Sequence, residues 1–188
     1  PSTGKILAIV SKPDYNPNTL LSDYEYIISG ESNQSLLNKS TLGLFAPGSI
    51  FKSMTALSYI RSNNDVNQYS YYCEGQIDLS DSDYITCFNH TVHGNEDLYD
   101  SFANSCNASF GNIGLQIGSE DLTATCDSLL FNTDLPTELS HKASQFVLDT
   151  DATDWEIAAT SIGQGKTLVT PLHMAMITSA IANGGNLM

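Results

Sequence analysis

The sequence predicts a protein of the α+β class, on the basis of two kinds of pattern. The apolar run from Ile6 to Val10 is short enough to be a buried strand, and residues 66–97 show no helical period and are typical of short strands or loops. Apolar residues recur at helical spacing after Ser49, after Asp97 and again near the end of the chain. We therefore expect both strands and helices in one chain.

The expected elements follow in chain order. They are a buried strand at 4–11, an irregular surface segment at 12–38, a helix at 49–62, short strands or loops at 66–97, helices from 97, at 108–117 and after 119, a polar loop at 132–153, and helices at 155–162 and 171–183.

Local signals mark the ends of these helices. Asn63-Asn64-Asp65 is expected to end the helix that starts near Ser49, and Asp97 is expected to cap the next one. Gly118 interrupts the long apolar pattern that follows, so two helices are predicted there. Pro171 suits the first turn of the last helix, which Gly184-Gly185 should close.

Composition and charge limit the function classes. The chain has 188 residues, enough for one domain with a core, and its net charge of −14 opposes binding to nucleic acid. It contains no signal peptide and no apolar run of 18 residues, so no membrane span is expected within it. Pro1 is not a natural start and Met188 lies within a continuing pattern, so we expect a piece of a longer protein.

The first candidate site residues are Ser49 and Lys52 in the sequence Ala46-Pro-Gly-Ser-Ile-Phe-Lys52. Their spacing places both on one face of a helix start, where free N–H groups and the helix dipole favour an alkoxide. Lys52 can accept the hydroxyl proton if burial keeps its amine neutral, which for a pKa near 7–8 costs roughly 4 kcal/mol in the charged form. The alternative is an ordinary N-cap serine with a solvated lysine.

Two further segments carry candidate polar groups. Ser105 and Asn107 lie at a junction between two predicted helices, where a hydroxyl can relay a proton and an amide can bind substrate. Local helix caps explain the same residues. Gly163-Gln164-Gly165 permits a close backbone approach, and a tight connection is the simpler interpretation of it.

The order of these segments resembles the transpeptidase domain of penicillin-binding proteins, most closely the monofunctional class B members. The resemblance rests on the first strand, 1–11, the nucleophile region 38–52, Ser105-Cys-Asn107, Gly163-Gln-Gly165, Thr170-Pro-Leu172 and Ala182-Asn-Gly-Gly185, and it spans nearly the whole chain. It implies the serine β-lactamase/transpeptidase-like fold, with an antiparallel sheet flanked by helices and a mainly helical subdomain, here in part only. Residues 1–188 would be one incomplete domain that continues beyond residue 188.

The resemblance also implies acyl transfer on the D-alanyl-D-alanine ends of peptidoglycan stem peptides, and acylation by β-lactams. Ser49 would be the nucleophile and Lys52 its general base, as in the Ser-x-x-Lys arrangement of these enzymes. Ser105 would pass a proton to the leaving D-alanine, Asn107 would hold substrate, and the Ser49 N–H would form half of an oxyanion hole. No cofactor is implied. The partner would be a membrane-embedded glycan polymerase, at the extracytoplasmic face of a bacterial cell membrane, with the anchor outside this sequence.

The chain departs from the family pattern in one major respect. The family's third motif, Lys-Ser/Thr-Gly, is absent from these residues, so this piece is expected to be inactive alone and to need strands that follow Met188. Lys39 replaces a usual arginine, which weakens bidentate pairing. A serine β-lactamase, a penicillin-sensing receptor domain and an inactive scaffold are the alternatives.

The cysteines raise two further questions. Cys87, His90, His93 and Cys106 form a conceivable zinc set, but their spacing fits no known finger pattern, so no metal is expected. The family often has cysteines near Cys73 and Cys87, and we expect these two to lie close together and to be able to form a disulfide in an oxidising exterior. Cys106 and Cys126 are expected to stay reduced.

Overall fold

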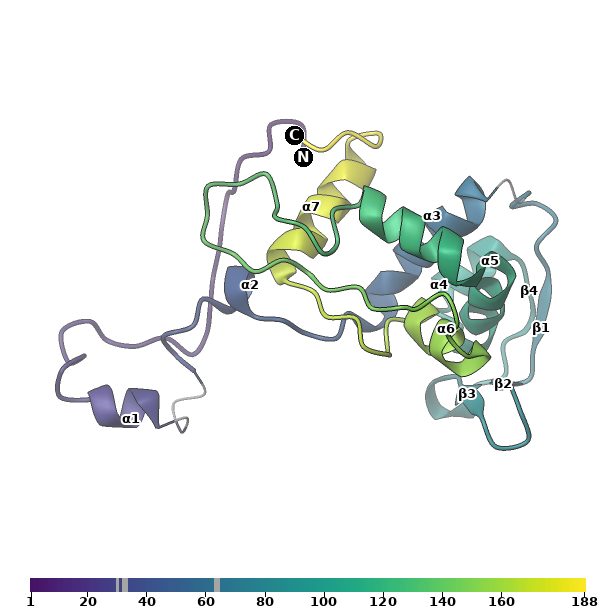
Figure 1. Ribbon diagram of the computed structural model, residues 1–188, viewed down its shortest axis with the longest axis horizontal. Coiled ribbons are helices and arrows are strands. Elements are labelled where there is room, and N and C mark those ends of the chain that lie inside the picture. Colours follow the sequence, from purple (N-terminus) through teal and green to yellow (C-terminus); the bar gives the residue numbers. More distant parts are fainter. Residues whose placement is uncertain (30, 32–33, 63–64) are drawn as a thin grey trace. The chain divides into compact units, whose positions relative to one another are not determined.

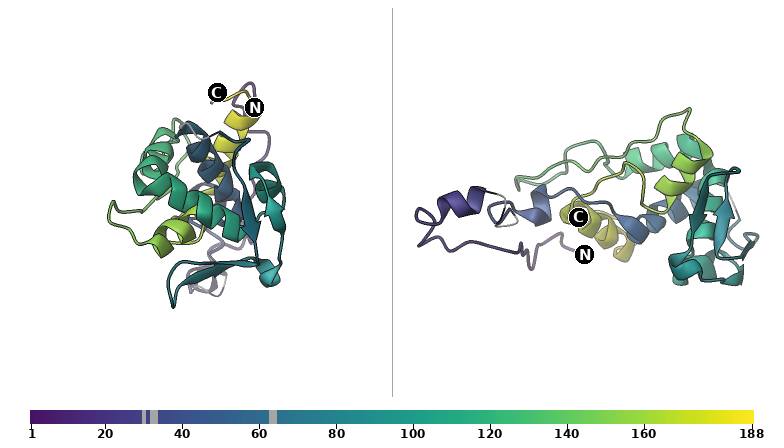
Figure 2. Two further views of the ribbon diagram at one scale, coloured as in Figure 1. Left: turned by 90° about the vertical axis from the view of Figure 1, so that its right-hand side faces the viewer. Right: turned by 90° about the horizontal axis from the view of Figure 1, so that it is seen from below.

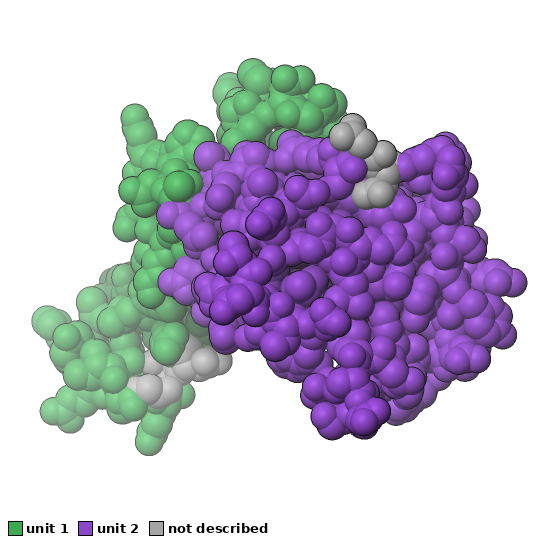
Figure 3. All heavy atoms as spheres, turned by 45° about the vertical axis from the view of Figure 1, so that its right-hand side comes forward, with its two compact units in different colours: residues 1–45, 133–144, 169–188 green, residues 46–132, 145–168 purple. Residues whose placement is uncertain are grey.

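The computed structural model describes residues 1–29, 31, 34–62 and 65–188 of the chain (Figure 1). The described residues form two compact units, coloured separately in Figure 3. Unit 1 comprises residues 1–45, 133–144 and 169–188, and unit 2 comprises residues 46–132 and 145–168. Among the helices of the described residues, none is both long and apolar enough to cross a membrane.

The described residues of unit 1 contain three helices joined by irregular segments. They are α1 (Tyr24–Ile28), α2 (Lys39–Leu42) and α7 (Pro171–Ala182), and α2 packs against α7. The segments beside them are tied by backbone hydrogen bonds, from Lys142 to Thr41 and in both directions between Phe45 and Val169. The short helices α1 and α2 were not predicted, because four or five residues are too few to show a helical period.

The strand predicted at 4–11 is wrong for this chain. These residues form no strand and are mostly exposed, with Leu7 and Val10 at 95% and 70% exposure. A strand requires a neighbouring strand for its backbone hydrogen bonds, and none of the described residues pairs with this stretch. The apolar run from Ile6 to Val10 is therefore not sufficient to form a strand within the described residues.

Unit 2 contains most of the predicted helices. Its elements are η1 (Gly48–Phe51), α3 (Lys52–Arg61), η2 (Phe88–His90), α4 (Leu98–Ala103), α5 (Asn107–Ser128) and α6 (Asp154–Ser161). Helix α3 ends close to the predicted position, while Asn63 and Asn64 lie outside the described residues. The two helices expected around Gly118 are one element broken at that glycine, where φ is 78° and ψ is 174°.

Side-chain caps explain where several helices begin. Asp97 accepts a hydrogen bond from the Asp100 N–H, as predicted, and starts α4. Thr153 and Glu156 form a capping box at α6, and Thr170 caps α7, with Pro171 in its first turn. These bonds satisfy N–H groups that a helix start leaves free.

The short strands expected at 66–97 form two antiparallel pairs in unit 2 (Figure 2). β1 (Tyr71–Cys73) pairs with β4 (Gly94–Glu96), and β2 (Gln76–Asp78) pairs with β3 (Tyr84–Thr86). The register places Cys73 opposite Gly94, so the end of β1 lies beside the start of β4. The α+β class is confirmed, with helices as the larger component.

The core of unit 2 is built around α5, which packs against both α3 and α6. Three buried aromatic rings, those of Phe51, Phe131 and Phe146, lie with centroids 6.0–6.2 Å apart. Edge and stacked arrangements of this kind add to the gain from burial alone. Because Phe51 immediately precedes Lys52, this packing fixes the start of α3.

Candidate active site

The turn that carries Ser49 is held by a close backbone contact. Gly48 has a φ of 58°, and its N–H donates to the Gly163 carbonyl oxygen at 2.9 Å. Ser49 follows in the 3₁₀ turn η1, directly before α3, so the predicted helix-start position is confirmed. The Ser49 side chain is exposed, and its hydroxyl makes no hydrogen bond with another described residue.

Gly163 must be glycine for this contact to exist. Its φ is 75°, and a Cβ atom added to it would lie 1.9 Å from the Gly48 carbonyl oxygen. The close approach that the Gly163-Gln164-Gly165 sequence predicts is therefore confirmed, and the surface approached is the turn beside Ser49. The backbone contact between Gly163 and Gly48 has a structural role, and it positions the turn that carries Ser49.

Lys52 is a buried lysine, with 2% of its surface exposed. Its Nζ donates to the Ser105 carbonyl oxygen at 2.6 Å, to the Ser105 hydroxyl at 3.0 Å and to the Asn107 Oδ1 at 2.7 Å. The ring of Phe110 lies below it, with the centroid 5.6 Å from Nζ. The solvated-lysine alternative is therefore wrong.

Burial changes the proton affinity of Lys52. Loss of water around the amine lowers its pKa to about 8, although negative charge on Cys106, Cys87 and Glu96 would act in the opposite direction. Burial, the condition that the sequence analysis sets for a neutral amine at Lys52, is met in the structure. A substantial fraction of the amine is neutral at the mildly alkaline end of the physiological range.

Ser105 lies in a backbone conformation that usually belongs to glycine. It follows α4 with a φ of 51°. Its N–H donates to the Phe102 carbonyl oxygen at 3.1 Å, and the Cys106 N–H donates to the Ser101 carbonyl oxygen at 3.0 Å. This is the Schellman pattern, with a left-handed residue just after the helix end. It turns both the carbonyl oxygen and the hydroxyl of Ser105 toward Lys52.

Hydrogen bonds to both the oxygen and the nitrogen of its side-chain amide orient Asn107. Its Oδ1 accepts from Lys52, and its Nδ2 donates to the Thr86 carbonyl oxygen at 2.9 Å, at the end of β3. The residue begins α5, so the helix start and the strand end together fix its side chain. Sequence reasoning missed Thr86 and Phe110, because a backbone carbonyl and a core aromatic ring have no recognisable motif.

The structure therefore brings three of the four predicted residues into direct contact. Lys52, Ser105 and Asn107 form one hydrogen-bonded group within unit 2, and Ser49 lies one turn before Lys52 on the same helix start. A buried amine of lowered pKa beside two polar side chains is suited to accept and relay protons.

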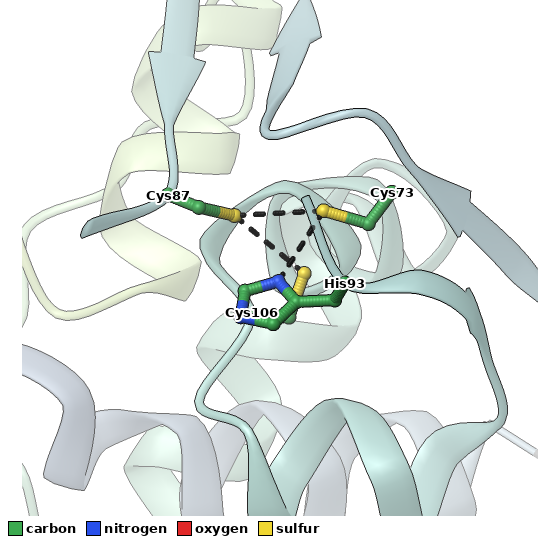
Figure 4. Close-up of side chains that lie close together, drawn as sticks. All are labelled: Cys73, Cys87, His93 and Cys106. Carbon is green, nitrogen blue, oxygen red and sulfur yellow. Dashed lines mark hydrogen bonds between the residues drawn. The ribbon is translucent and has the colours of Figure 1, made fainter. Parts of the chain in front are cut away.

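Cys73 and Cys87 lie close together, as predicted, with their sulfur atoms 3.7 Å apart. No disulfide joins them: both are free thiols, as are Cys106 and Cys126. Cys106 lies equally close to Cys87, at 3.7 Å, and the Nδ1 atom of His93 lies 3.4 Å from the Cys73 sulfur (Figure 4). We call Cys73, Cys87, His93 and Cys106 the thiol–imidazole cluster.

The cluster differs from the zinc set considered from the sequence. Cys73 belongs to it and His90 does not, and the four ligand atoms lie within 4.8 Å of one another. Burial raises the pKa of the Cys87 and Cys106 thiols. Burial acts in the same direction on Cys73, but hydrogen bonds from His93 and Gly75 outweigh it and lower the pKa of that thiol to about 7.

Comparison with known proteins gives a consistent picture. The family model for the penicillin binding protein transpeptidase domain matches residues 1–188. Peptidoglycan D,D-transpeptidase PbpA of Mycolicibacterium smegmatis is 30% identical, across 98% of this chain and 40% of its own length. MrdA of Acinetobacter baumannii, also named a peptidoglycan D,D-transpeptidase, is 29% identical across 99% of this chain and 30% of its own.

Solved structures agree with the sequence matches. The ceftriaxone acyl-enzyme complex of penicillin-binding protein A from M. tuberculosis superposes with a TM-score of 0.87 at 26% identity, over 98% of this chain and 43% of that one. The D,D-transpeptidase domain of a peptidoglycan glycosyltransferase from Eggerthella lenta gives a TM-score of 0.88 at 26% identity, over 98% and 48%. The chain spans less than half the length of each of these proteins.

Proposed function

Because the chain belongs to the penicillin-binding protein transpeptidase domain family, with class B members among its relatives, we propose that its parent protein is a peptidoglycan D,D-transpeptidase. It cross-links stem peptides that end in D-alanyl-D-alanine, through an ester on Ser49, and β-lactams acylate the same residue. The observation that carries the proposal is the buried Lys52, one turn after an exposed serine and hydrogen-bonded to Ser105 and Asn107.

The proposed reaction has two steps. The Ser49 oxygen attacks the carbonyl carbon of the penultimate D-alanine while its proton passes to the neutral Lys52 amine. The carbon–nitrogen bond then breaks, and the proton reaches the leaving D-alanine amine through the Ser105 hydroxyl. An amine of a second stem peptide attacks the ester, forms the cross-link and returns the proton to Ser49. Asn107 holds Lys52 and the substrate amide, and the Ser49 N–H donates to the oxyanion.

The site in these 188 residues is proposed to be incomplete. The chain contains no Lys-Ser/Thr-Gly sequence, which the resemblance assigns to carboxylate binding and to the strand that supplies the second oxyanion donor. Loss of one such donor costs roughly 3–4 kcal/mol, or about 10²–10³ in rate. We expect the full-length protein to be acylated by labelled penicillin faster than this chain by at least that factor, and equal rates would contradict the proposal.

The setting proposed for the parent protein follows from its substrate. Cross-linking of peptidoglycan requires an extracytoplasmic location, with an anchor in the cell membrane outside these residues and a membrane-embedded glycan polymerase as partner. The net charge of −14 on these 188 residues supports the expectation that nucleic acid is not a ligand.

Adduct mapping on the full-length protein tests the assignment of the nucleophile. We expect mass spectrometry to find one penicilloyl group, on Ser49, and Ser49→Ala to abolish acylation. Ser53→Ala is the matched control, because Ser53 lies one turn further on and its hydroxyl donates to the Ile50 carbonyl oxygen at 2.7 Å. Acylation that persists in Ser49→Ala, or an adduct on another serine, would overturn the proposal.

A further inference from the structure

Glu96 is a buried carboxyl group near the candidate active site, and the proposed reaction does not use it. It is the last residue of β4, and 2% of its surface is exposed. The preceding residue, Asn95, is exposed, so the alternation of the strand turns Glu96 inward, where an apolar side chain is the usual occupant. Because burial of an incompletely paired charge costs free energy, a carboxylate at this position points to a specific role.

Only one of the two Glu96 oxygens is paired. Oε1 accepts a hydrogen bond from Asn104 Nδ2 at 2.7 Å, whereas Oε2 is buried and makes no hydrogen bond with any described residue. Within the described part of the chain, no lysine or arginine forms an ion pair with Glu96. A carboxylate can accept about four hydrogen bonds, so most of the negative charge of this group is available to act on its surroundings.

The contact with Asn104 connects Glu96 to the turn at Ser105. Asn104 is the C-cap of α4, and the next residue, Ser105, has the left-handed φ of 51°. Asp97, directly after Glu96, caps the start of the same six-residue helix. Two neighbouring residues therefore hold the two ends of α4. The end that Glu96 holds is the one that presents the Ser105 carbonyl oxygen and hydroxyl to Lys52.

The charge of Glu96 also acts on Lys52. Burial, the larger effect, lowers the pKa of the amine, and negative charge on Cys106, Cys87 and Glu96 opposes it. These three groups act from the start of α5, from the residue after β3 and from β4. Burial raises the pKa of both thiols, so they stay protonated near neutral pH. Of the three groups, Glu96 is therefore the one that supplies negative charge.

We propose that Glu96 is a positioning residue for acyl transfer, with two effects. Its contact with Asn104 holds the turn at Ser105. Its charge stabilises the ammonium group that Lys52 becomes when it accepts the Ser49 proton. Because this ammonium forms only as the proton leaves Ser49, the interaction is stronger in the transition state than in the resting site. The inference rests on the proposed function, in which Lys52 is the general base.

Glu96→Gln tests the charge, because glutamine keeps the shape of the side chain and an oxygen for Asn104. The measurement is acylation of the full-length protein by labelled penicillin between pH 6 and 9.5. Without the charge Lys52 is a weaker base, so the rate above pH 8 should fall by roughly threefold to tenfold. The amine also stays neutral to lower pH, so the decline in rate should begin at lower pH and the two profiles should converge as the pH falls.

Asp97→Asn is the matched control for the loss of one negative charge. Asp97 is the adjacent residue, it is exposed, and asparagine is an equally good N-cap. Its rate profile should coincide with that of the unmodified protein. A reduction in the rate of Glu96→Gln by the same factor at every pH would indicate a merely structural effect and would overturn the role of the charge. An equal shift of the profile in both variants would do the same.

Asn104→Ala tests the hold on the turn. The residue has a φ of −80° and a ψ of −7°, which alanine adopts freely, so the substitution removes the side-chain amide and leaves the helix end otherwise intact. The Ser105 and Cys106 N–H groups, which both donate to carbonyl oxygens of α4, should exchange their hydrogens faster. Acylation should slow at every pH. Unchanged exchange at these two groups, together with an unchanged rate, would overturn the contribution of Asn104.

Stability measurements separate this role from a contribution to the fold. Glu96→Leu replaces an incompletely paired carboxylate with an apolar side chain of similar size, so its urea midpoint should equal or exceed that of the unmodified protein. Its acylation should nevertheless be slower. A clearly lower midpoint would assign the carboxylate to the fold and overturn the inference. If the unmodified protein is not acylated on Ser49, the proposed function fails. If it is acylated and Glu96→Gln matches it at every pH, only the inference about Glu96 fails.

Discussion

The Nζ atom of Lys52 lies 2.6 Å from the backbone carbonyl oxygen of Ser105, a residue whose φ of 51° is in the left-handed region. For a residue with a side chain this conformation costs about 1–2 kcal/mol. Glycine would avoid that cost but would lack the hydroxyl that also contacts Lys52, at 3.0 Å. Strain retained at such a position is typical of functional sites.

Substitutions at Ser105 separate the strain from the chemistry. Ser105→Gly and Ser105→Ala both remove the hydroxyl, so both should slow acylation of the full-length protein by about 10²–10⁴-fold. Ser105→Gly should be more stable than Ser105→Ala by about 1 kcal/mol, because only alanine keeps the left-handed strain. Urea unfolding and acylation kinetics measure the two effects. Equal stability would show that the turn is not strained, and unchanged acylation would remove Ser105 from the mechanism.

Acylation should depend on pH through Lys52. Burial lowers the pKa of its amine to about 8, and only the neutral amine can accept the Ser49 proton. As pH falls below 8, the charged form increases, so the rate should fall about tenfold per pH unit, and above 8 it should level off. Acylation rates between pH 6 and 9.5, with circular dichroism at each pH as a folding control, test this. A rate that rises as pH falls would contradict Lys52 as the base.

Removal of the Lys52 amine gives a second test of the same role. Lys52→Ala should slow acylation by about 10²–10⁴-fold and abolish the rise in rate near pH 8. The fold should persist, because an uncharged side chain at this buried position leaves no unpaired charge. A pH profile that is unchanged in Lys52→Ala would assign the titration to another group.

The helices could be predicted because their signals are local. Asp97 as a cap, Gly118 as an interruption and Pro171 as a first-turn residue each act within one or two turns of the chain. The segment from Ile6 to Val10 shows the limit of this reasoning. Its apolar pattern was correctly recognised, but a strand also requires a neighbouring strand, and the pattern does not say which residues supply it.

The sequence predicted those residues of the candidate site that belong to short recognisable motifs. Lys52, Ser105 and Asn107 were identified from short sequences in a family order, and the structure brings them together. The thiol–imidazole cluster was anticipated only in part: Cys87, His93 and Cys106 were grouped with His90, whereas the structure groups them with Cys73. Its members come from separate elements with irregular spacing, which no local pattern reveals. Only the β1–β4 register, which places Cys73 opposite Gly94, shows why Cys73 and His93 meet.

Gly163 should be intolerant of a side chain. A Cβ atom would lie 1.9 Å from the Gly48 carbonyl oxygen and would also meet an unfavourable φ of 75°. We expect Gly163→Ala to lower the free energy of unfolding by roughly 3–5 kcal/mol and to slow acylation by moving the Ser49 turn. Gly184→Ala is the control, since its φ of 64° is similar but nothing lies within 4 Å of its added Cβ atom. Equal losses in urea unfolding would mean that backbone strain, not the contact with Gly48, is the cause.

The stretch from Lys5 to Ile9 should gain protection in the full-length protein. Within the described residues its backbone groups make no hydrogen bonds with other backbone groups. It also lines an apolar groove of about 420 Å³ with α7 in unit 1. An extended apolar stretch whose backbone groups make no hydrogen bonds with other backbone groups is suited to pair with an added strand. Hydrogen exchange should therefore be fast at Leu7 in this chain and slow in the full-length protein, while α5 is protected in both. Fast exchange at Leu7 in both proteins would show that the stretch never joins a sheet.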